Sequence, residues 1–218
     1  MSKNIDQIFL QAFRDHKDGK IIEAERLYKD ILQTNPTHPD ANHNLGILKM
    51  SFNKISESLI LFKTAIDSNS KVDQYWVSYA NAQASKELYK DSEESFKKAL
   101  SINPYLFVTH CNLGVVQIKL KKLDDAELSF KKAIEIKTDY VDAHYNLGIL
   151  LKTQDRLDEA ELSYKKALSF NSNDNLKKNI IGSYGELLLQ LNKHNIGLKF
   201  ITEGHGVIVF SKKNLKII

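Results

Sequence analysis

Residues 141–174 read VDAHYNLGILLKTQDRLDEAELSYKKALSFNSND, and the pattern of this stretch occurs four more times toward the N-terminus. Large aromatic residues mark it at intervals of 34 residues: Tyr28, Phe62, Phe96, Phe130 and Tyr164. Self-similarity at a fixed period of this length is typical of proteins that stack one small supersecondary unit. The period divides the chain into five repeats, which span 5–38, 39–72, 73–106, 107–140 and 141–174.

Small residues at fixed internal positions indicate that each repeat is a pair of closely packed helices. With each repeat numbered from 1, position 8 is Ala12, Gly46, Ala80, Gly114 and Gly148, and position 20 is Ala24, Ser58, Ser92, Ala126 and Ala160. Small side chains let two helix axes approach to about 8–10 Å. The pattern predicts one helix over roughly positions 2–14 and a second over roughly positions 18–30, with the aromatic ring of position 24 filling the space toward the neighbouring helix.

Aspartate and proline residues mark the expected ends of these helices. Asp124 and Asp158 lie just before the small residue of position 20, where a short polar side chain can cap the free N–H groups of a helix start. Pro36 and Pro104 occupy position 32, where proline ends a helix without breaking it. We therefore expect the aspartates to cap the second helices and the prolines to follow them.

The fifth repeat resembles the tetratricopeptide repeat family most closely. The matching segments are Asp142-Ala143-His144-Tyr145-Asn146-Leu147-Gly148, Leu157-Asp158-Glu159-Ala160 and Tyr164-Lys165-Lys166-Ala167. The resemblance covers 5–174 after a short extension at 1–4, with departures at Gln11, Ile31, Ser70 and Tyr79-Ala80. It implies an all-α fold, a right-handed α-solenoid of five helix pairs. Such stacks present their first helices on a concave face that binds partners.

The period fails after residue 174, and the sequence there predicts a different ending. Apolar spacing predicts a helix over 176–191 and a short one over 195–203, so we expect residues 175–203 to form a capping helix pair. Gly182 and Gly185 are expected to weaken the first of these helices by up to about 1 kcal/mol each relative to alanine. Residues 204–218 then form a tail in which Val207, Ile208, Val209 and Phe210 favour an extended strand.

A strand with no sheet beside it leaves backbone groups unpaired, so the tail has three possible fates. It folds back on the last helices, it pairs or swaps with a second molecule, or it is a linker without a role of its own. The segment Gly204-His205-Gly206-Val207-Ile208-Val209-Phe210 resembles the Gly-x-Gly-Val-Ile-x-Phe ending of some bacterial tetratricopeptide proteins. In those proteins it leads toward an oxygenase or transferase domain, which we do not expect here.

A row of lysines runs along the second helices and raises the question of nucleic-acid binding. Position 25 is Lys29, Lys63, Lys97, Lys131 and Lys165, while position 21 is Glu25, Leu59, Glu93, Glu127 and Glu161. A glutamate four residues before a lysine pairs with it on a helix surface. Binding to phosphate backbones requires uncompensated positive charge. We therefore interpret the row as a solvated outer face and expect no nucleic-acid partner.

Several other classes of protein are disfavoured by what the sequence lacks. No apolar run approaches the roughly 20 residues of a membrane span, and the first residues show no signal-peptide pattern. Cys111 is the lone cysteine, and no histidine pair has metal-ligand spacing. We expect a cytoplasmic protein that is not an enzyme, has no cofactor and binds no metal or membrane.

An asparagine recurs on the first helices, at position 6, where the residues are Leu10, Asn44, Ser78, Asn112 and Asn146. Asparagine is a poor residue for a helix interior, so its recurrence needs a reason. Its amide both donates and accepts hydrogen bonds and can hold an extended peptide main chain. The ladder is similar to that of the O-linked N-acetylglucosamine transferase repeats, with Ser78 as an interruption. Alternatively, these side chains bond neighbouring helices or loops.

Two further positions complete the predicted peptide-binding set. Position 5 contributes His43, Val77, Cys111 and Tyr145, and position 9 contributes Asn81. The set differs from the two-carboxylate clamp of chaperone-binding tetratricopeptide domains, which places Lys at position 5 and Asn at position 9 of one repeat. An apolar or neutral extended segment is therefore the expected ligand, and the tail itself is one such segment.

The sequence thus predicts a scaffold or adaptor that binds an extended peptide of a protein partner in its concave groove. Two other hypotheses remain open at this point. The chain could be a regulatory or substrate-recruiting module of a split glycosyltransferase or oxygenase system. It could also associate with itself, as a homo-oligomer in which the tail of one molecule occupies the groove of another.

Overall fold

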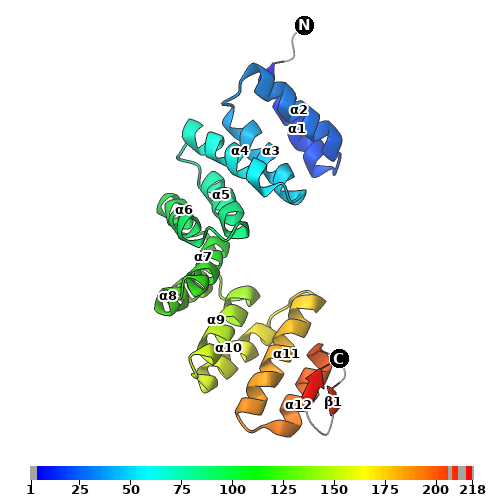
Figure 1. The fold of residues 1–218 in the computed structure, drawn as a ribbon, viewed down its shortest axis with the longest axis vertical. Coiled ribbons are helices and arrows are strands. Elements are labelled where there is room, and N and C mark those ends of the chain that lie inside the picture. Colours follow the sequence, from blue (N-terminus) through cyan, green and yellow to red (C-terminus); the bar gives the residue numbers. More distant parts are fainter. Residues whose placement is uncertain (1–3, 206–207, 211–214, 218) are drawn as a thin grey trace. The chain divides into compact units, whose positions relative to one another are not determined.

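A computed structural model of the chain describes residues 4–205, 208–210 and 215–217. Within these residues the fold is an all-α solenoid of helix pairs followed by two short strands (Figure 1). The elements are α1 (Ile5–Lys17), α2 (Ile21–Thr34), α3 (Pro39–Ser51), α4 (Ile55–Ser68), α5 (Asp73–Ser85), α6 (Tyr89–Ile102), α7 (Phe107–Lys119), α8 (Leu123–Ile136), α9 (Val141–Thr153), α10 (Leu157–Ser169), α11 (Asp174–Gln190), α12 (His194–His205), β1 (Ile208–Phe210) and β2 (Leu215–Ile217). The predicted helices of all five repeats are confirmed.

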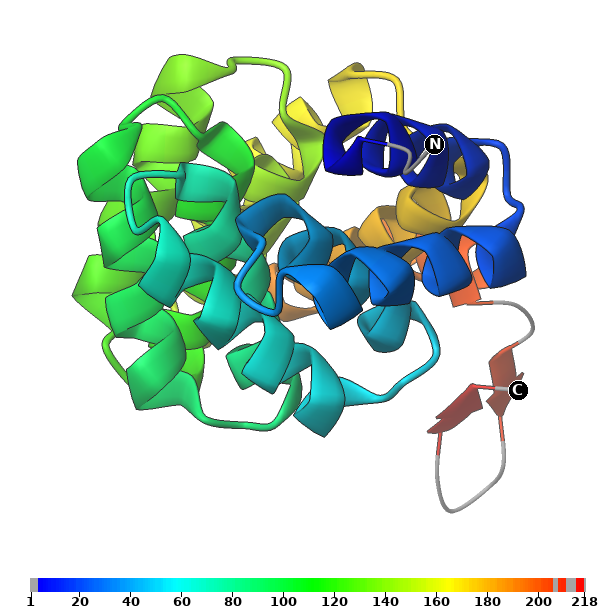
Figure 2. The same cartoon turned by 90° about the horizontal axis from the view of Figure 1, so that it is seen from above.

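The chain divides into two compact units at Leu120. The first unit holds α1 to α7, and the second holds α8 to α12 with the two strands. Inside each unit the two helices of a pair lie side by side, as α1 and α2 or α11 and α12 do (Figures 1 and 2). Each second helix also contacts the first helix of the next pair, for example α2 with α3 and α10 with α11.

The aromatic ladder packs against the small residues of position 8, as the sequence predicts. A methyl group on Gly46 would lie only 2.6 Å from the Phe62 ring, and one on Gly148 would lie 2.9 Å from the Tyr164 ring. Both rings are fully buried. These contacts leave little room for a larger side chain at position 8, which explains why only glycine and alanine occur there.

The helix starts differ from the sequence prediction. Asp124 and Asp158 were expected to be caps, but they lie inside the first turns of α8 and α10. Lys122 and Arg156 occupy the N-cap positions and make no side-chain capping bond there. The aspartates act instead through charge, because a carboxylate in the first turn interacts favourably with the positive end of the helix dipole.

The turn inside each repeat uses a left-handed backbone conformation at position 15. The residues and their φ angles are Gly19 at 75°, Asn53 at 59°, Glu87 at 60°, Lys121 at 60° and Asp155 at 61°. Glycine adopts this conformation freely and asparagine tolerates it, whereas a long side chain such as that of Glu87 makes it unfavourable. The geometry of the turn is therefore imposed by the helix pair rather than by the local residue.

Replacing Glu87 with glycine is expected to stabilise the protein. Relief of the left-handed conformation outweighs the added freedom of the unfolded chain, so Glu87→Gly should raise the free energy of unfolding by about 0.5 kcal/mol. The matched control is Lys86→Gly, one residue earlier at φ −97°, which should lower it. Urea unfolding measures both, and an equal loss in the two variants would contradict this account of the turn.

The capping pair packs α11 against α12 more closely than side chains would allow. A methyl group on Gly185 would lie 2.7 Å from the backbone N of Ile201, and one on Gly204 would lie 2.3 Å from the backbone N of Gly182. Gly197 approaches α11 in the same way. The glycines that we expected only to weaken α11 are therefore required by the contact between the two helices.

Gly185→Ala should destabilise the capping pair despite the better helix propensity of alanine. The added methyl group meets backbone atoms that cannot move independently, and overpacking of this kind costs about 1–3 kcal/mol. Asn179→Ala, at an exposed position of the same helix, should be neutral or slightly stabilising. Thermal unfolding followed by circular dichroism compares the two, and a tolerated Gly185→Ala would show that α11 and α12 can separate slightly at no cost.

The ending of the chain departs from its prediction in two respects. Helix α12 continues through Gly204 to His205, which the sequence placed in the tail. Strand β1 finds a partner within the chain, since it pairs antiparallel with β2 and aligns Ile208 with Ile217. A local hairpin was not among the expected fates of the tail. Of the tail residues singled out above, Val207 lies outside the described residues, and Ile208, Val209 and Phe210 form β1.

Candidate functional site

A groove of about 830 Å³ lies on the first unit, across helices α3, α5 and α7. Buried rings from α4 and α6 form part of its lining. The lining residues are Ile47, Met50, Ser51, Phe62, Ser78, Asn81, Ala84, Ser85, Tyr89, Phe96, Asn112, Val115, Val116 and Lys119. Apolar side chains cover much of this surface, and serine and asparagine supply most of the polar groups.

The repeat explains why these residues share one surface. Ser78, Asn81 and Ser85 follow one another at spacings of three and four along α5, which places them on one face of the helix. Asn112, Val115 and Lys119 have the same spacing on α7. Three residues of the predicted set, Ser78, Asn81 and Asn112, are thus brought together in the groove.

Two asparagine side chains form the polar centre of the groove. Asn112 Nδ2 donates to Asn81 Oδ1 at 3.1 Å, from α7 to α5. Each amide carries two donor hydrogens and an acceptor oxygen, and both residues are half-buried. Among the described residues no other hydrogen bond engages these two amides, so the pair retains both donor and acceptor capacity.

The other predicted residues of the first unit are placed differently. Asn44 donates from Nδ2 to the backbone oxygen of Asp40 at 2.8 Å and is not part of the groove lining. His43 and Cys111 are buried between helices, 8% and 2% exposed, and Val77 is half-buried. Position 5 therefore serves mainly helix packing, whereas positions 6, 9 and 13 of α5 and α7 face the groove.

Two predicted residues belong to the second unit, whereas the groove lies on the first. Tyr145 lies on α9, and its hydroxyl is 3.1 Å from Ser183 Oγ on α11. Asn146 follows it on α9 and is half-buried. The Tyr145 contact links the first helices of successive pairs within this unit.

His43 lies beneath the groove in an environment that disfavours its charged form. Its Nε2 is 2.9 Å from Ser78 Oγ, and its ring centroid is 4.8 Å from that of Tyr75. Burial lowers the pKa of His43 to about 4, although the nearby Asp40 carboxylate acts in the opposite direction. His43 is therefore a neutral packing residue at pH 7.

The lowered pKa makes stability depend on pH. The unfolded chain takes up the proton near pH 6.5 but the folded chain only near pH 4, so the stabilisation from neutral His43 is present above pH 6.5 and is lost as the pH falls toward 4. We expect a loss of about 2 kcal/mol between pH 7 and pH 5 from this group. The variant His43→Gln should lose less over the same interval when unfolding is measured in urea at each pH.

An exposed histidine provides the control for this measurement. His194→Gln, at an exposed position at the start of α12, makes the same chemical change away from the packing beneath the groove. If His43→Gln and the unsubstituted protein show the same slope, His43 does not control acid stability.

The lysine row of the outer face is paired as predicted. Four lysines bind the glutamate one turn earlier: Lys29 to Glu25 at 2.6 Å, Lys97 to Glu93 at 2.7 Å, Lys131 to Glu127 at 2.7 Å and Lys165 to Glu161 at 2.8 Å. Lys63, which has leucine at that place, pairs with Asp67 instead. The charge of this row is therefore compensated.

Three of these glutamates, Glu25, Glu127 and Glu161, also bind a cation of the following helix pair, which the sequence did not reveal. Glu25 binds Lys49 at 2.9 Å, and Glu161 binds Lys193 at 2.7 Å. Bonds from Lys29 and Lys49 lower the pKa of Glu25 to about 2. Burial would raise the pKa of Glu161, but its hydrogen bonds outweigh this and lower it to about 2. Each of these glutamates therefore bridges its own repeat and the helix pair that follows.

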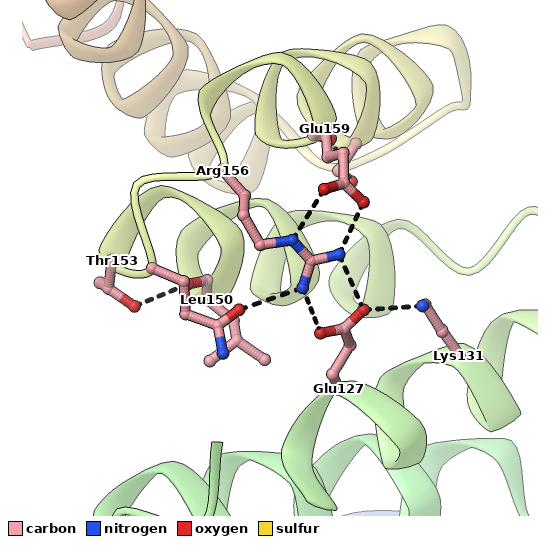
Figure 3. A network of polar contacts seen from close by, with 8 residues as sticks. Glu127, Lys131, Leu150, Thr153, Arg156 and Glu159 are labelled. Carbon is pink, nitrogen blue, oxygen red and sulfur yellow. Dashed lines mark hydrogen bonds and ion pairs between the residues drawn. The ribbon is translucent and has the colours of Figure 1, made fainter. Parts of the chain in front are cut away.

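Figure 3 shows this arrangement between α8 and the α9–α10 turn. Arg156 Nη1 and Nη2 donate to the two oxygens of Glu127 at 2.5 and 3.2 Å, while its Nε and Nη2 also reach Glu159. Lys131 binds Glu127 from the other side. The hydrogen bonds of Arg156, then those of Lys131, lower the pKa of Glu127. The cation that reaches the glutamate from the following helix pair occupies internal position 11 in the case of Lys49 and position 16 in the case of Arg156. It therefore does not recur with the period of the repeat.

Among the described residues, no three histidine, cysteine, aspartate or glutamate side chains converge as metal ligands. None of the helices of this part of the chain is both long and apolar enough to cross a membrane.

Comparison with known families identifies the repeat. Segments 73–105, 108–140 and 141–174 match family models described as tetratricopeptide repeat. These segments are tetratricopeptide repeats. The pairs α1–α2 and α3–α4 have the same helix lengths, and Gly46 contacts Phe62 as Gly148 contacts Tyr164 in the last tetratricopeptide repeat. No curated protein sequence matches the chain.

Solved structures show the same tetratricopeptide fold. PilW, described as a widely conserved type IV pilus biogenesis factor, is 14% identical with a TM-score of 0.78, over 92% of this chain and 91% of its own. PilF of Pseudomonas aeruginosa is 15% identical with a TM-score of 0.77, over 90% and 88%. YrrB, described as a tetratricopeptide protein with an unusual peptide-binding site, is 20% identical with a TM-score of 0.65, over 81% and 90%.

Proposed function

We propose that the chain is a protein-interaction scaffold that binds an extended segment of a partner protein in the groove of α3, α5 and α7. The observation that carries this proposal is the Asn81–Asn112 pair above an apolar floor. A peptide main chain presents one donor and one acceptor per residue, which matches what the two amides still offer. The apolar lining would receive side chains of the same segment.

The groove is large enough to receive part of an extended segment. Its volume of about 830 Å³ can hold the side chains of a few residues. Ile47 and Val115, at its rim, are 36% and 38% exposed, so apolar surface is available to a partner. A peptide-binding site is also what the description of the similar YrrB structure names for that protein.

The amide pair is the target of the decisive test. A library of random dodecapeptides displayed on phage is selected against the immobilised full chain, and an enriched peptide is synthesised. Its affinity for the unsubstituted protein and for Asn81→Ala with Asn112→Ala is then measured by calorimetry. Loss of two hydrogen bonds to the peptide should weaken binding about tenfold or more.

Asn44→Ala is the matched control, because Asn44 occupies the same internal position as Asn112 but is not part of the groove lining. It should leave the affinity unchanged. Circular dichroism should show equal helicity in all variants. If the peptide binds the variant that lacks both amides as tightly as the unsubstituted protein, the groove is not the binding site. If no peptide is enriched from the library, the chain does not bind peptides as proposed.

A further inference from the structure

We propose that the segment held in the groove is acidic, in contrast to the apolar or neutral segment expected from the sequence: an extended internal stretch in which an aspartate or glutamate side chain, close to a large apolar residue, pairs with Lys119. This inference rests on the proposed function and specifies its ligand. It follows from the charge of the groove, the position of that charge on α7 and the apolar surface beside it.

Lys119 is the single charged side chain among the fourteen residues that line the groove. It occupies position 13 of its repeat, where the neighbouring first helices place the neutral residues Ser51 and Ser85. Its side chain is exposed, and no carboxylate pairs with it anywhere in the described part of the chain. Lys49, on α3, is by contrast nearly buried and bound to Glu25 and Glu57.

The surface beside Lys119 is apolar. Val115 and Val116 lie one turn before it on α7, and the buried rings of Phe62 and Phe96 form part of the lining. A cation at the edge of an apolar surface is complemented by a carboxylate next to an apolar side chain. An ion pair at such a rim contributes modestly to affinity and more strongly to the choice of partner.

The spacing along α7 indicates how close the carboxylate of the ligand must be to the part of its main chain that Asn112 holds. Lys119 follows Asn112 by seven residues, which is about 10 Å along a helix. An extended chain covers this length with about three residues. A peptide whose main chain is held at Asn112 would therefore bring a carboxylate to Lys119 from within about three residues.

A side chain fits this site better than a chain terminus. The lining offers one ammonium group at one edge, and its two asparagine amides suit a main chain that continues past the site. Capture of a terminal carboxylate generally uses several backbone or cationic donors that converge on it. We therefore assign the carboxylate to an aspartate or glutamate inside the segment.

The test compares phage selections against the full chain, against Lys119→Glu and against Lys98→Glu. Lys98 is exposed on α6 outside the groove lining and serves as the matched control. The unsubstituted protein and Lys98→Glu should enrich aspartate or glutamate several-fold within three residues of a large apolar residue. Lys119→Glu should enrich lysine or arginine there instead.

A double-mutant cycle then assigns the contact. An enriched peptide, acetylated and amidated so that its termini are uncharged, should bind Lys119→Gln about two- to fivefold more weakly. Replacing its acidic residue by the amide should cost the same factor, and the two changes together should cost no more than one alone.

The other outcomes contradict either the acidic ligand or peptide binding itself. Apolar peptides enriched without an acidic residue, or peptides that bind only with a free C-terminal carboxylate, would overturn this inference and leave the groove as a peptide site. The inference is also wrong if the losses in affinity from Lys119→Gln and from the substituted peptide add in the double-mutant cycle. A selection with no enrichment over a blank surface would overturn the proposed function, and this inference with it.

Discussion

The contact between the aromatic ring of position 24 and the small residue of position 8 determines how the helices of a repeat lie. At Gly46 and Gly148 the ring occupies the space that a side chain would otherwise fill. The first helix is thereby fixed in rotation, with one face against the ring and the opposite face outward. The groove across α3, α5 and α7 is a consequence, because it consists mainly of the residues on that outward face.

The glutamates of position 21 add a second kind of connection, between repeats rather than within them. Glu25, Glu127 and Glu161 are each held by a lysine of their own helix and by a cation of the following helix pair, as in Glu127 with Lys131 and Arg156. In a repeat array, stability is approximately the sum of the units and of the contacts between neighbours. These glutamates therefore act on the neighbour contacts, where a single acidic side chain affects two repeats.

Periodicity accounts for what the sequence could predict. Helix α9 begins and ends within one residue of its expected bounds, because the small and aromatic residues fix both helices of the pair. The turn at position 15 was not predicted, since Glu87 and Lys121 carry no signal for a left-handed conformation. The cations that bind the glutamates of position 21 were missed for a different reason, because they come from different internal positions. Contacts that do not repeat leave no period to detect.

The candidate site, too, could be predicted only in part from the sequence. Ser78, Asn81 and Asn112 were assigned to the groove from their internal positions, and they do line it. His43 and Cys111 were assigned to it as well, but a shift of one residue turns a helix by about 100° and directs position 5 into the packing between helices. Lys119 was passed over because a lysine is unremarkable in sequence. Its meaning depends on the neutral surface around it and on the carboxylate that it does not have within the described chain.

The buried imidazole and the bridging carboxylates respond to acid in different ranges, which sets an order of events. His43 stays neutral down to about pH 4, whereas Glu25 and Glu161 keep their charge down to about pH 2. Their contributions to stability begin to fall below about pH 6.5 for the histidine and only below about pH 4.5 for the glutamates. Mild acidification therefore destabilises the packing of His43 beneath the groove, while Glu25 and Glu161 keep their charge and their ion pairs. Moderate acidity would therefore weaken the packing beneath the groove before Glu25 and Glu161 lose their charge.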